Sequence, residues 1–253
     1  MNRAELSALF EAHPTALAEG LLGCRLTVAA ADGAVTVRLT ETEAYGDAGV
    51  DPGAHSFRGR TERNAALFGP VRHTYVYLNY GIHKCLNLVG HPADQAGGVL
   101  LRAGEVVDGR GLAVGRRGRD TAVKLLSGPG NLGQGLGITL AMGHAPVELV
   151  DDAPPADSVS LAEGPAADQT IAAPGAPADA VRPARFLLAP PPPGQSRAEV
   201  RRGPRVGVSG EGGSVRFPWR FHLAGEASVS AYRAGRNVPP AGPSAPSAPS
   251  AGN

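Results

Sequence analysis

A single extended segment, residues 34–45 (AVTVRLTETEAY), limits the folds that this chain can adopt. Every second residue of Val35–Leu39 is apolar, which is the period that predicts a β-strand with one apolar face. If that register continues, Glu41, Glu43 and Tyr45 lie on the same face. A carboxylate buried there is costly unless it is paired, hydrogen-bonded or lines a wet pocket. The segment therefore predicts a strand that carries a candidate catalytic carboxylate.

The alternative is that the strand twists or bulges before Glu41, so that both acids face solvent. Residues 24–31 alternate in the same way, and Asp32 and Gly33 form the two-residue turn of a hairpin. The acids would then sit on a rigid hairpin. A further strand over residues 99–105 places Arg102 among apolar neighbours, where an arginine needs an acidic partner, and Glu43 is the natural one.

Aromatic residues gather close behind this strand. Aromatics make up only 5% of the chain, yet four of its five tyrosines lie within residues 45–80, namely Tyr45, Tyr75, Tyr77 and Tyr80. The intervening loop, rich in Gly, Pro and Asp, delivers His55. This concentration suits a pocket that holds a flat ring by stacking. The alternative is that the tyrosines pack on the sheet, as strand tyrosines commonly do.

Residues 73–79 and 82–89 are expected to form two strands around a tight turn at Tyr80 and Gly81. A large aromatic at a hairpin tip is exposed, and an exposed apolar side chain in a basic neighbourhood is what a wedge between stacked bases requires. Tyr80 is that candidate. The alternative, in which Tyr80 folds back on its own hairpin, stays open.

The net charge of +1 conceals an uneven distribution of charge. Residues 151–180 contain six acids and neither Lys nor Arg, so the remainder carries +7. Arginines cluster beside the motifs, at Arg58, Arg60, Arg63 and Arg72 and again at Arg201, Arg202, Arg205, Arg216 and Arg220. Such clustering is typical of a face that contacts phosphates, although a solvated charged surface gives the same pattern.

Length and composition predict one sizeable core. The 253 residues are 42% hydrophobic, which suits a single domain over residues 1–236. We expect a flexible acidic insertion at about 151–184, a proline-rich spacer at 190–194 and a disordered Pro/Ala/Ser tail at 237–253. No apolar run reaches membrane-spanning length, so a soluble, intracellular protein is expected. Two cysteines without a CxxC pair argue against a structural metal site, and we expect none.

Seven motifs in this order resemble the alkyladenine (3-methyladenine) DNA glycosylase family in its bacterial form. They are ETEAYGD, AHSFRGRTERN, FGP, YVYLNYGIHKCLN, VLLRAGE, LLSGPGNLGQGLGI and PRVGVS. The resemblance runs from about Ala16 to about Tyr232, with one poorly matched interval. It implies an α+β fold with a single domain, a curved and mostly antiparallel sheet, flanking helices and a protruding β-hairpin.

The resemblance also implies a reaction. Glu43 would be the general base that activates a water to attack the anomeric carbon of a nucleotide flipped out of the duplex. Arg102 and the backbone carbonyl of Val206 would help to hold that water. The product would be an abasic site, with no metal or other cofactor involved.

The same comparison assigns the pocket. Tyr45, His55 and Tyr77 correspond to the walls that stack on the ejected base, and Asn87 to a residue that screens the purine edge. We expect selectivity to depend on His55, Leu67 and Asn87. Two further roles complete the assignment. Tyr80 would fill the gap left in the duplex, and Arg58, Arg60, Arg63, Arg205 and Arg220 would contact the DNA backbone.

The expected substrate is double-stranded DNA with alkylated or deaminated purines, bound by a monomer in the bacterial cytoplasm at the nucleoid, with no membrane contact. Only Lys84 and Lys124, besides the terminal amine, could form a Schiff base, so hydrolysis without strand cleavage is predicted. Glu62 and Lys84 depart from the family pattern, which bears on substrate range. The alternative function is a non-catalytic nucleic-acid-binding module on the same fold. Hydrolysis of free nucleosides is disfavoured because it needs neither Tyr80 nor the arginines.

Overall fold

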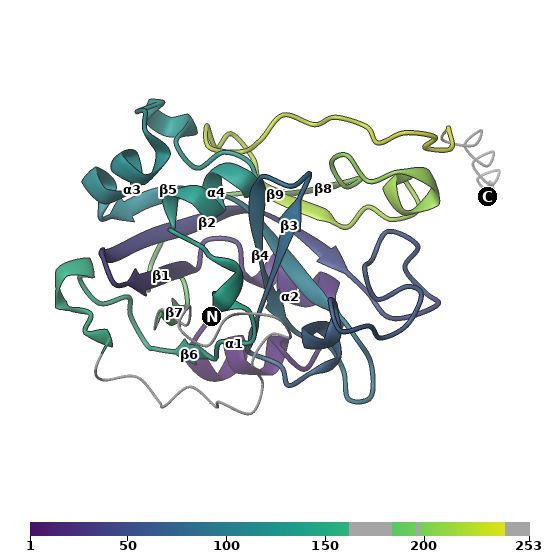
Figure 1. Ribbon diagram of the computed structural model, residues 1–253, viewed down its shortest axis with the longest axis horizontal. Helices are drawn as coiled ribbons and strands as arrows, with labels where there is room; N and C mark the ends of the chain where they lie inside the picture. The colour runs from purple at the N-terminus through teal and green to yellow at the C-terminus, as the bar shows by residue number, and fades with distance from the viewer. Residues whose placement is uncertain (162–183, 196–197, 241–253) are drawn as a thin grey trace, which may run out of the picture.

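The computed structural model describes residues 1–161, 184–195 and 198–240. Within these ranges the chain forms four α-helices and a nine-stranded sheet (Figure 1). The helices are α1 (Arg3–Leu9), α2 (Pro14–Gly20), α3 (Arg110–Arg117) and α4 (Pro129–Gly135). The strands are β1 (Arg25–Ala30), β2 (Gly33–Tyr45), β3 (Thr74–Asn79), β4 (His83–Val89), β5 (Gly98–Asp108), β6 (Val147–Leu149), β7 (Arg185–Ala189), β8 (Val200–Gly203) and β9 (Arg220–Leu223).

The sheet is built around β2. Its strand order is β3-β4-β5-β2-β1-β7-β6, and β9 pairs with both β2 and β8. All pairings are antiparallel except the parallel pair β6 and β7. One edge of β2 pairs with β5, while the other edge pairs first with β1 and then with β9. The fold class predicted from the sequence, α+β with a curved and mostly antiparallel sheet, is confirmed.

The pairing of β2 with β5 is irregular where the acids lie. The register shifts between Leu39 and Glu41 and again between Glu41 and Thr42. The Thr42 hydroxyl donates to the Ala18 carbonyl of α2 over 2.7 Å. Because neighbouring strand residues point to opposite faces, Glu41 and Glu43 lie on the face away from α2. Both are fully buried, so the alternative in which these acids face solvent is wrong.

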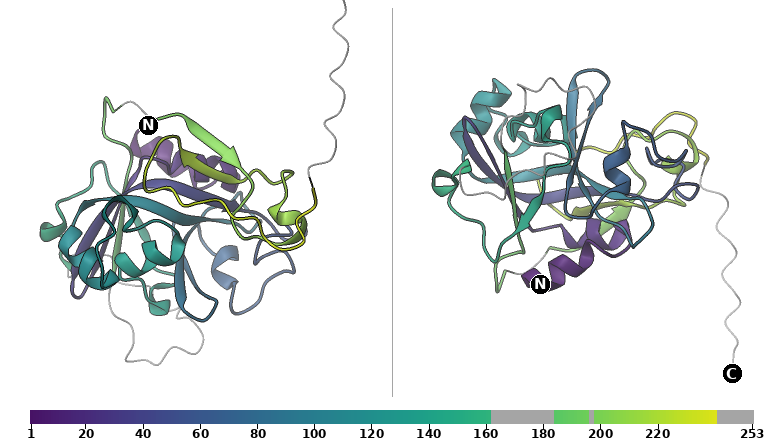
Figure 2. Two further views of the ribbon diagram at one scale, coloured as in Figure 1. Left: turned by 90° about the horizontal axis from the view of Figure 1, so that it is seen from above. Right: turned by 60° about the horizontal axis from the view of Figure 1, so that its bottom comes forward.

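Helices cover the sheet from two sides. α1 and α2 lie on one side, and α3 and α4 lie on the other (Figures 1 and 2). α1 begins with a capping box, in which the Asn2 side chain accepts from the Glu5 amide and the Glu5 carboxylate accepts from the Asn2 amide, each at 2.9 Å. Pro14 occupies the first turn of α2, where its missing N–H costs nothing. Leu6, Phe10 and Leu17 bury these helices against the core.

The glycine-rich segment 127–137 contains the helix α4, although glycine favours turns over helices. A Cβ atom on Gly133 would lie 2.0 Å from the Lys84 carbonyl oxygen of β4. The glycine therefore permits close packing of helix against strand, which outweighs its poor helix propensity.

The domain boundaries stay a prediction. Of the expected insertion, residues 151–161 are described and include a 3-10 turn at Ala156–Ser158, and residues 162–183 lie outside the described part. Residues 241–253 of the expected tail also lie outside it. β3 and β4 do pair as a hairpin, although whether it protrudes from the domain stays a prediction.

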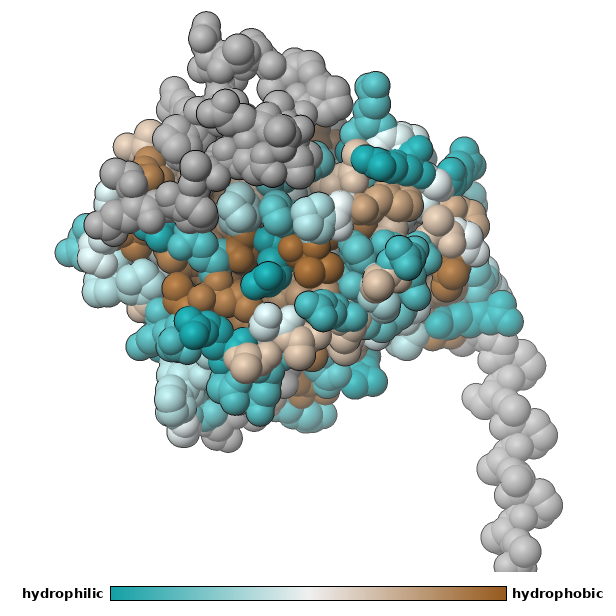
Figure 3. Space-filling view, turned by 90° about the horizontal axis from the view of Figure 1, so that it is seen from below, coloured by the Kyte–Doolittle hydropathy of each residue, from teal (hydrophilic) through white to brown (hydrophobic). Residues whose placement is uncertain are grey.

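The surface does not present one broad apolar face in the view of Figure 3. Hydrophobic side chains there form small patches that hydrophilic residues interrupt. Among the residues that the structure describes, none of the helices has both the length and the apolar character needed to traverse a lipid bilayer.

Candidate active site

Glu43 lies at the end of β2 with three hydrogen-bond donors around its carboxylate. Its Oε1 accepts from the backbone N–H of Val206 at 2.7 Å. Its Oε2 accepts from the Tyr45 hydroxyl at 2.9 Å and from Arg102 Nη1 at 3.2 Å. A carboxylate has about four lone-pair positions. One acceptor position of Glu43 therefore remains for another ligand.

A second acid shares Arg102 with Glu43. Glu41 Oε1 accepts from Arg102 Nε at 2.9 Å and from Arg220 Nε at 2.7 Å, and the backbone amide and hydroxyl of Ser230 complete its shell at 2.8 and 2.9 Å. Burial opposes the charged form of Glu41, but the two guanidinium groups and these hydrogen bonds outweigh it and lower its pKa. Burial likewise opposes the charge on Arg102, yet Glu43 and Glu41 together raise its pKa. The two acids and two arginines form a neutral, tightly bonded floor.

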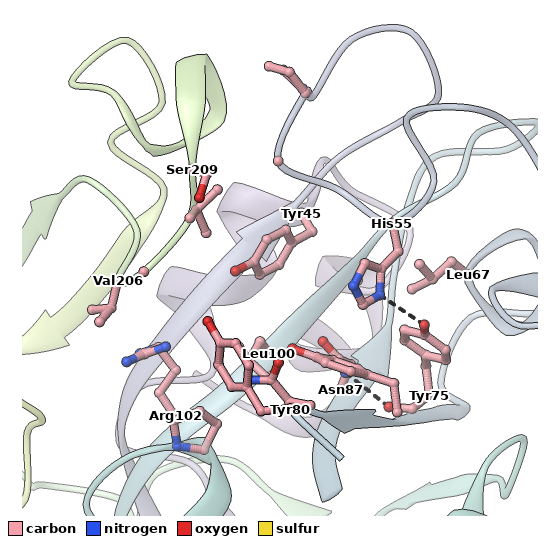
Figure 4. Close-up of a pocket in the computed structure, with 18 of the residues that line it drawn as sticks. Tyr45, His55, Leu67, Tyr75, Tyr80, Asn87, Leu100, Arg102, Val206 and Ser209 are labelled. Atoms are coloured by element: carbon pink, nitrogen blue, oxygen red, sulfur yellow. Dashed lines mark hydrogen bonds between the residues drawn. The ribbon is translucent and has the colours of Figure 1, made fainter. Parts of the chain in front are cut away.

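A cleft of about 630 Å³ opens beside this floor. Val206 and Ser209 line one side, and His55, Leu67 and Tyr75 line the opposite side (Figure 4). All three groups that donate to Glu43 belong to residues of the cleft lining, whereas Glu43 lies directly behind them. A group bound in the cleft would therefore approach the Glu43 carboxylate between the three groups that donate to it.

Rings make up one wall of the cleft. The His55 ring lies edge-on to Tyr77, with centroids 4.6 Å apart, and Tyr77 stacks against Tyr75 at 5.7 Å. His55 Nδ1 lies 2.9 Å from the Tyr75 hydroxyl. Asn87 donates its amide to the Tyr75 carbonyl at 3.0 Å, which orients its side chain at the wall. The arrangement offers flat surfaces to a planar ligand.

The rings of this wall are held uncharged. Burial raises the pKa of Tyr75 to about 12, and burial followed by the contact with Cys85 raises the pKa of Tyr77 further. Burial, and secondarily the positive charge of Arg63, lowers the pKa of His55 below its ordinary value of 6.5. At neutral pH His55 therefore presents a neutral imidazole to the cleft.

The lowered pKa of His55 predicts a loss of stability in mild acid. The unfolded chain takes up the histidine proton near pH 6.5 and the folded chain only at lower pH, so the unfolded state binds more protons in between. The free energy of unfolding should decrease as the pH falls from 7.5 to 5.5. Urea denaturation at a series of pH values measures this, and His55→Gln should flatten the decrease. A stability that stays level or rises in that window would contradict the assignment.

Tyr80 occupies the tip of the β3–β4 hairpin. The turn closes with the Ile82 amide donating to the Asn79 carbonyl at 3.1 Å. Tyr80 has a φ of 49°, a left-handed conformation that is uncommon for a bulky residue, and glycine at position 81 accommodates the φ of 72° that follows. The side chain is 84% exposed, so it does not fold back on its hairpin. It borders the cleft.

A buried ion pair braces the cleft from behind. Arg205, with no exposed surface, contacts both carboxylate oxygens of Asp51 at 2.6 Å and also donates to the carbonyls of Ala44 and Gly212. Its guanidinium lies 4.6 Å from the centroid of the Tyr45 ring. The pair therefore connects the loop that carries His55 to the segment that carries Val206.

The chain matches known proteins over most of its length. A sequence model described as methylpurine-DNA glycosylase (MPG) matches residues 8–227. The chain belongs to the methylpurine-DNA glycosylase family. A protein of Frankia casuarinae named "Putative 3-methyladenine DNA glycosylase" is 42% identical over 221 residues, which are 87% of this chain and 89% of the relative. A protein of Nocardia farcinica with the same name is 43% identical over 233 residues, covering 90% and 91% of the two chains.

Membership of the methylpurine-DNA glycosylase family makes the chain a DNA glycosylase of the 3-methyladenine type. The structure brings most of the predicted site residues of this glycosylase to one cleft. The predicted residues that line it are Tyr45, His55, Leu67, Tyr77, Tyr80, Asn87, Arg102 and Val206.

For two arginines the expected contact with the DNA backbone is wrong. Arg205 is fully buried against Asp51, and Arg220 is buried against Glu41, so neither guanidinium is free to meet a phosphate. Arg58, Arg60 and Arg63 are exposed, and none of them pairs with an acid within the described residues of this glycosylase. Clustering along the sequence does not distinguish the two cases, because burial depends on tertiary packing.

The sequence does not reveal the buried pair of Arg205 with Asp51 or the bonds of Ser230 to Glu41. The sequence pattern places Asp51 in a loop and gives no signal for Ser230, although each bonds a buried guanidinium or carboxylate. A signal did exist for Glu41. It shares a strand face with Glu43, and two buried acids require two cations. Among residues 1–161, 184–195 and 198–240, no group of three or more His, Cys, Asp or Glu could hold a metal ion in this glycosylase.

Proposed function

We propose that the protein hydrolyses the N-glycosidic bond of alkylated or deaminated purines in duplex DNA and leaves an abasic site. In this proposal the damaged nucleotide swings out of the double helix into the cleft, and a water activated by Glu43 attacks its anomeric carbon. The protein works as a monomer on nucleoid DNA in the bacterial cytoplasm.

The observation that carries the proposal is the setting of Glu43. Its carboxylate keeps one acceptor position open behind Tyr45, Arg102 and Val206, which line a cleft with flat aromatic walls. A water bonded there becomes a nucleophile as the carboxylate takes its proton. The sugar gains oxocarbenium character as the base departs, and the same carboxylate stabilises that charge. Arg102 and the Val206 carbonyl orient the water.

The walls of the cleft account for the substrate class. Tyr45, His55 and Tyr77 stack on the extruded purine, and Asn87 and Leu67 limit its edges. Alkylated purines are electron-deficient and leave easily, so tolerant stacking with modest catalysis suffices for them. Selectivity then depends largely on how readily a damaged base leaves the duplex.

Cleavage stops at the abasic site in this proposal. A lyase needs an amine that forms a Schiff base with the sugar. Lys84 and Lys124 are exposed, and neither borders the cleft; Lys124 donates to the Val229 carbonyl at 2.9 Å. Borohydride should therefore trap no covalent complex between protein and DNA.

Incubation with a duplex that contains hypoxanthine or a methylated purine, followed by hot alkali, tests the function. We expect a strand break at the lesion only after alkali, together with release of the free base. Binding of the duplex without any alkali-sensitive product would instead support the alternative, a non-catalytic nucleic-acid-binding module.

Tyr80 provides a second test, because its proposed role is to fill the space that the flipped nucleotide leaves. Stacking of one base on an aromatic ring contributes about 1–3 kcal/mol. Tyr80→Ser should therefore slow excision from duplex DNA by about tenfold or more while leaving stability unchanged, since the side chain is 84% exposed. Single-turnover rates on duplex and single-stranded substrates measure the effect.

The matched control is Tyr232→Ser. Tyr232 is also exposed but does not border the cleft. Equal rates for the two variants, or an equal loss on single-stranded DNA, would remove the case for a wedge.

A further inference from the structure

Among the described residues that line the cleft, Arg233 is an arginine that the proposed reaction does not use. Its residue lines the cleft and is exposed to solvent, so it stands at the rim rather than at the floor. No carboxylate of the described residues lies within salt-bridge distance of it. By contrast, the charge of Arg102 is met by Glu41 and Glu43. The positive charge at the rim is therefore uncompensated.

The backbone around Arg233 is fixed against the segment that holds Glu43. The Gly207 amide donates to the Arg233 carbonyl at 2.8 Å, and the Gly210 amide donates to the Arg236 carbonyl at 2.9 Å. Between them, a Cβ atom on Gly235 would lie 2.0 Å from the Val208 carbonyl oxygen. The rim is thus packed closely onto the loop after Val206, whose amide binds Glu43. A ligand held at the rim would be placed relative to the carboxylate.

The same loop offers polar groups to an anion. The backbone amides of Val208 and Ser209 donate to no acceptor within the described residues, and both residues line the cleft. The Ser209 hydroxyl accepts from the Arg236 amide at 3.3 Å, which leaves its own proton for another acceptor. A guanidinium, a hydroxyl and free amides on the lining of one cleft suit a phosphate oxygen.

We propose that Arg233 and Ser209 form a phosphate subsite for one of the two phosphodiesters that flank the extruded nucleotide. The proposal rests on the proposed function in one respect, that a nucleotide enters the cleft. The cation serves the phosphate rather than the base, since a guanidinium against a cationic alkylated purine would repel it. Holding this phosphate sets the sugar's distance from Glu43.

Replacement of single phosphates by neutral methylphosphonates tests the subsite. Duplexes carry hypoxanthine with a methylphosphonate at its 5′ or its 3′ side, and binding is measured with the full chain in the Glu43→Gln background, where the base stays attached. With Arg233 present, one of the two replacements should weaken binding by about tenfold. With Arg233→Gln, the same replacement should change binding by no more than about twofold, and the slope of log Kd against log salt should fall by about 0.9.

The control is Arg236→Gln, which removes a neighbouring exposed arginine that does not line the cleft. It should keep the full tenfold sensitivity to the methylphosphonate. The subsite would be overturned if each methylphosphonate weakened DNA binding equally in the proteins with Arg233 and with Arg233→Gln. It would also be overturned if the effect of Arg233→Gln on binding depended only on the lesion base. Failure of the wild type to release a base would contradict the proposed function instead, because the binding comparison does not require excision.

Discussion

Replacement of Glu43 by glutamine should slow base excision by about 10²- to 10⁴-fold, which is the usual contribution of a general base. The amide cannot take a proton from water and carries no charge to stabilise the departing sugar. Its oxygen can still accept from the Val206 amide. Arg102 also keeps its bond to Glu41, so the fold and DNA binding should persist. Single-turnover excision from a hypoxanthine duplex, with enzyme in excess, measures the rate.

Glu105→Gln is the matched control for this change. Glu105 belongs to β5, which pairs with β2, but its side chain is exposed and bonds Arg38 on the surface. It should excise at the wild-type rate. A Glu43→Gln protein that binds the lesion duplex and excises within about threefold of wild type would leave general-base catalysis by Glu43 without support.

The largest effect on stability should come from Asp51→Asn. This change leaves the Arg205 guanidinium charged and buried without its counter-ion, and uncovering one partner of a buried pair costs about 3–5 kcal/mol. The same change loosens the loop that carries His55, so excision should fall as well. The free energy of unfolding from urea titration is the quantity to compare.

The comparison for that variant is Asp120→Asn, which breaks the exposed pair of Asp120 with Arg110. Such exposed pairs contribute little to the free energy of unfolding, because water screens both charges. If Asp51→Asn costs no more than Asp120→Asn, the brace behind the cleft contributes little to the fold. A protein with both Asp51 and Arg205 replaced by apolar residues should recover part of the loss, because no charge is then left buried and unpaired.

Local patterns in the sequence were enough to predict the strand that carries Glu43 and the hairpin that carries Tyr80. Both features can be recognised from residues close together in the sequence, namely alternating apolar residues and a short turn. The structure pairs β1 with β2 and β3 with β4 accordingly. The pairing of Glu43 with Arg102 also followed from one rule, that a buried guanidinium needs an acid.

The parts that the sequence did not reveal depend on contacts between distant segments. Arg205 meets Asp51 across 154 positions, and Ser230 meets Glu41 across 189. The sequence shows Arg205 as one of several arginines in a basic stretch, and only packing separates it from the exposed ones. Likewise, the glycines of α4 favour a turn by local propensity, and their packing partner lies in a strand 49 residues away, as from Lys84 to Gly133.

The most direct test is a crystal structure of the Glu43→Gln protein bound to a duplex that contains hypoxanthine. We expect the hypoxanthine base outside the helix, stacked between Tyr45, His55 and Tyr77, with its anomeric carbon facing residue 43 and the Tyr80 ring inserted in the duplex. A complex in which the base remains paired inside the helix, or is extruded away from the cleft, would contradict the account.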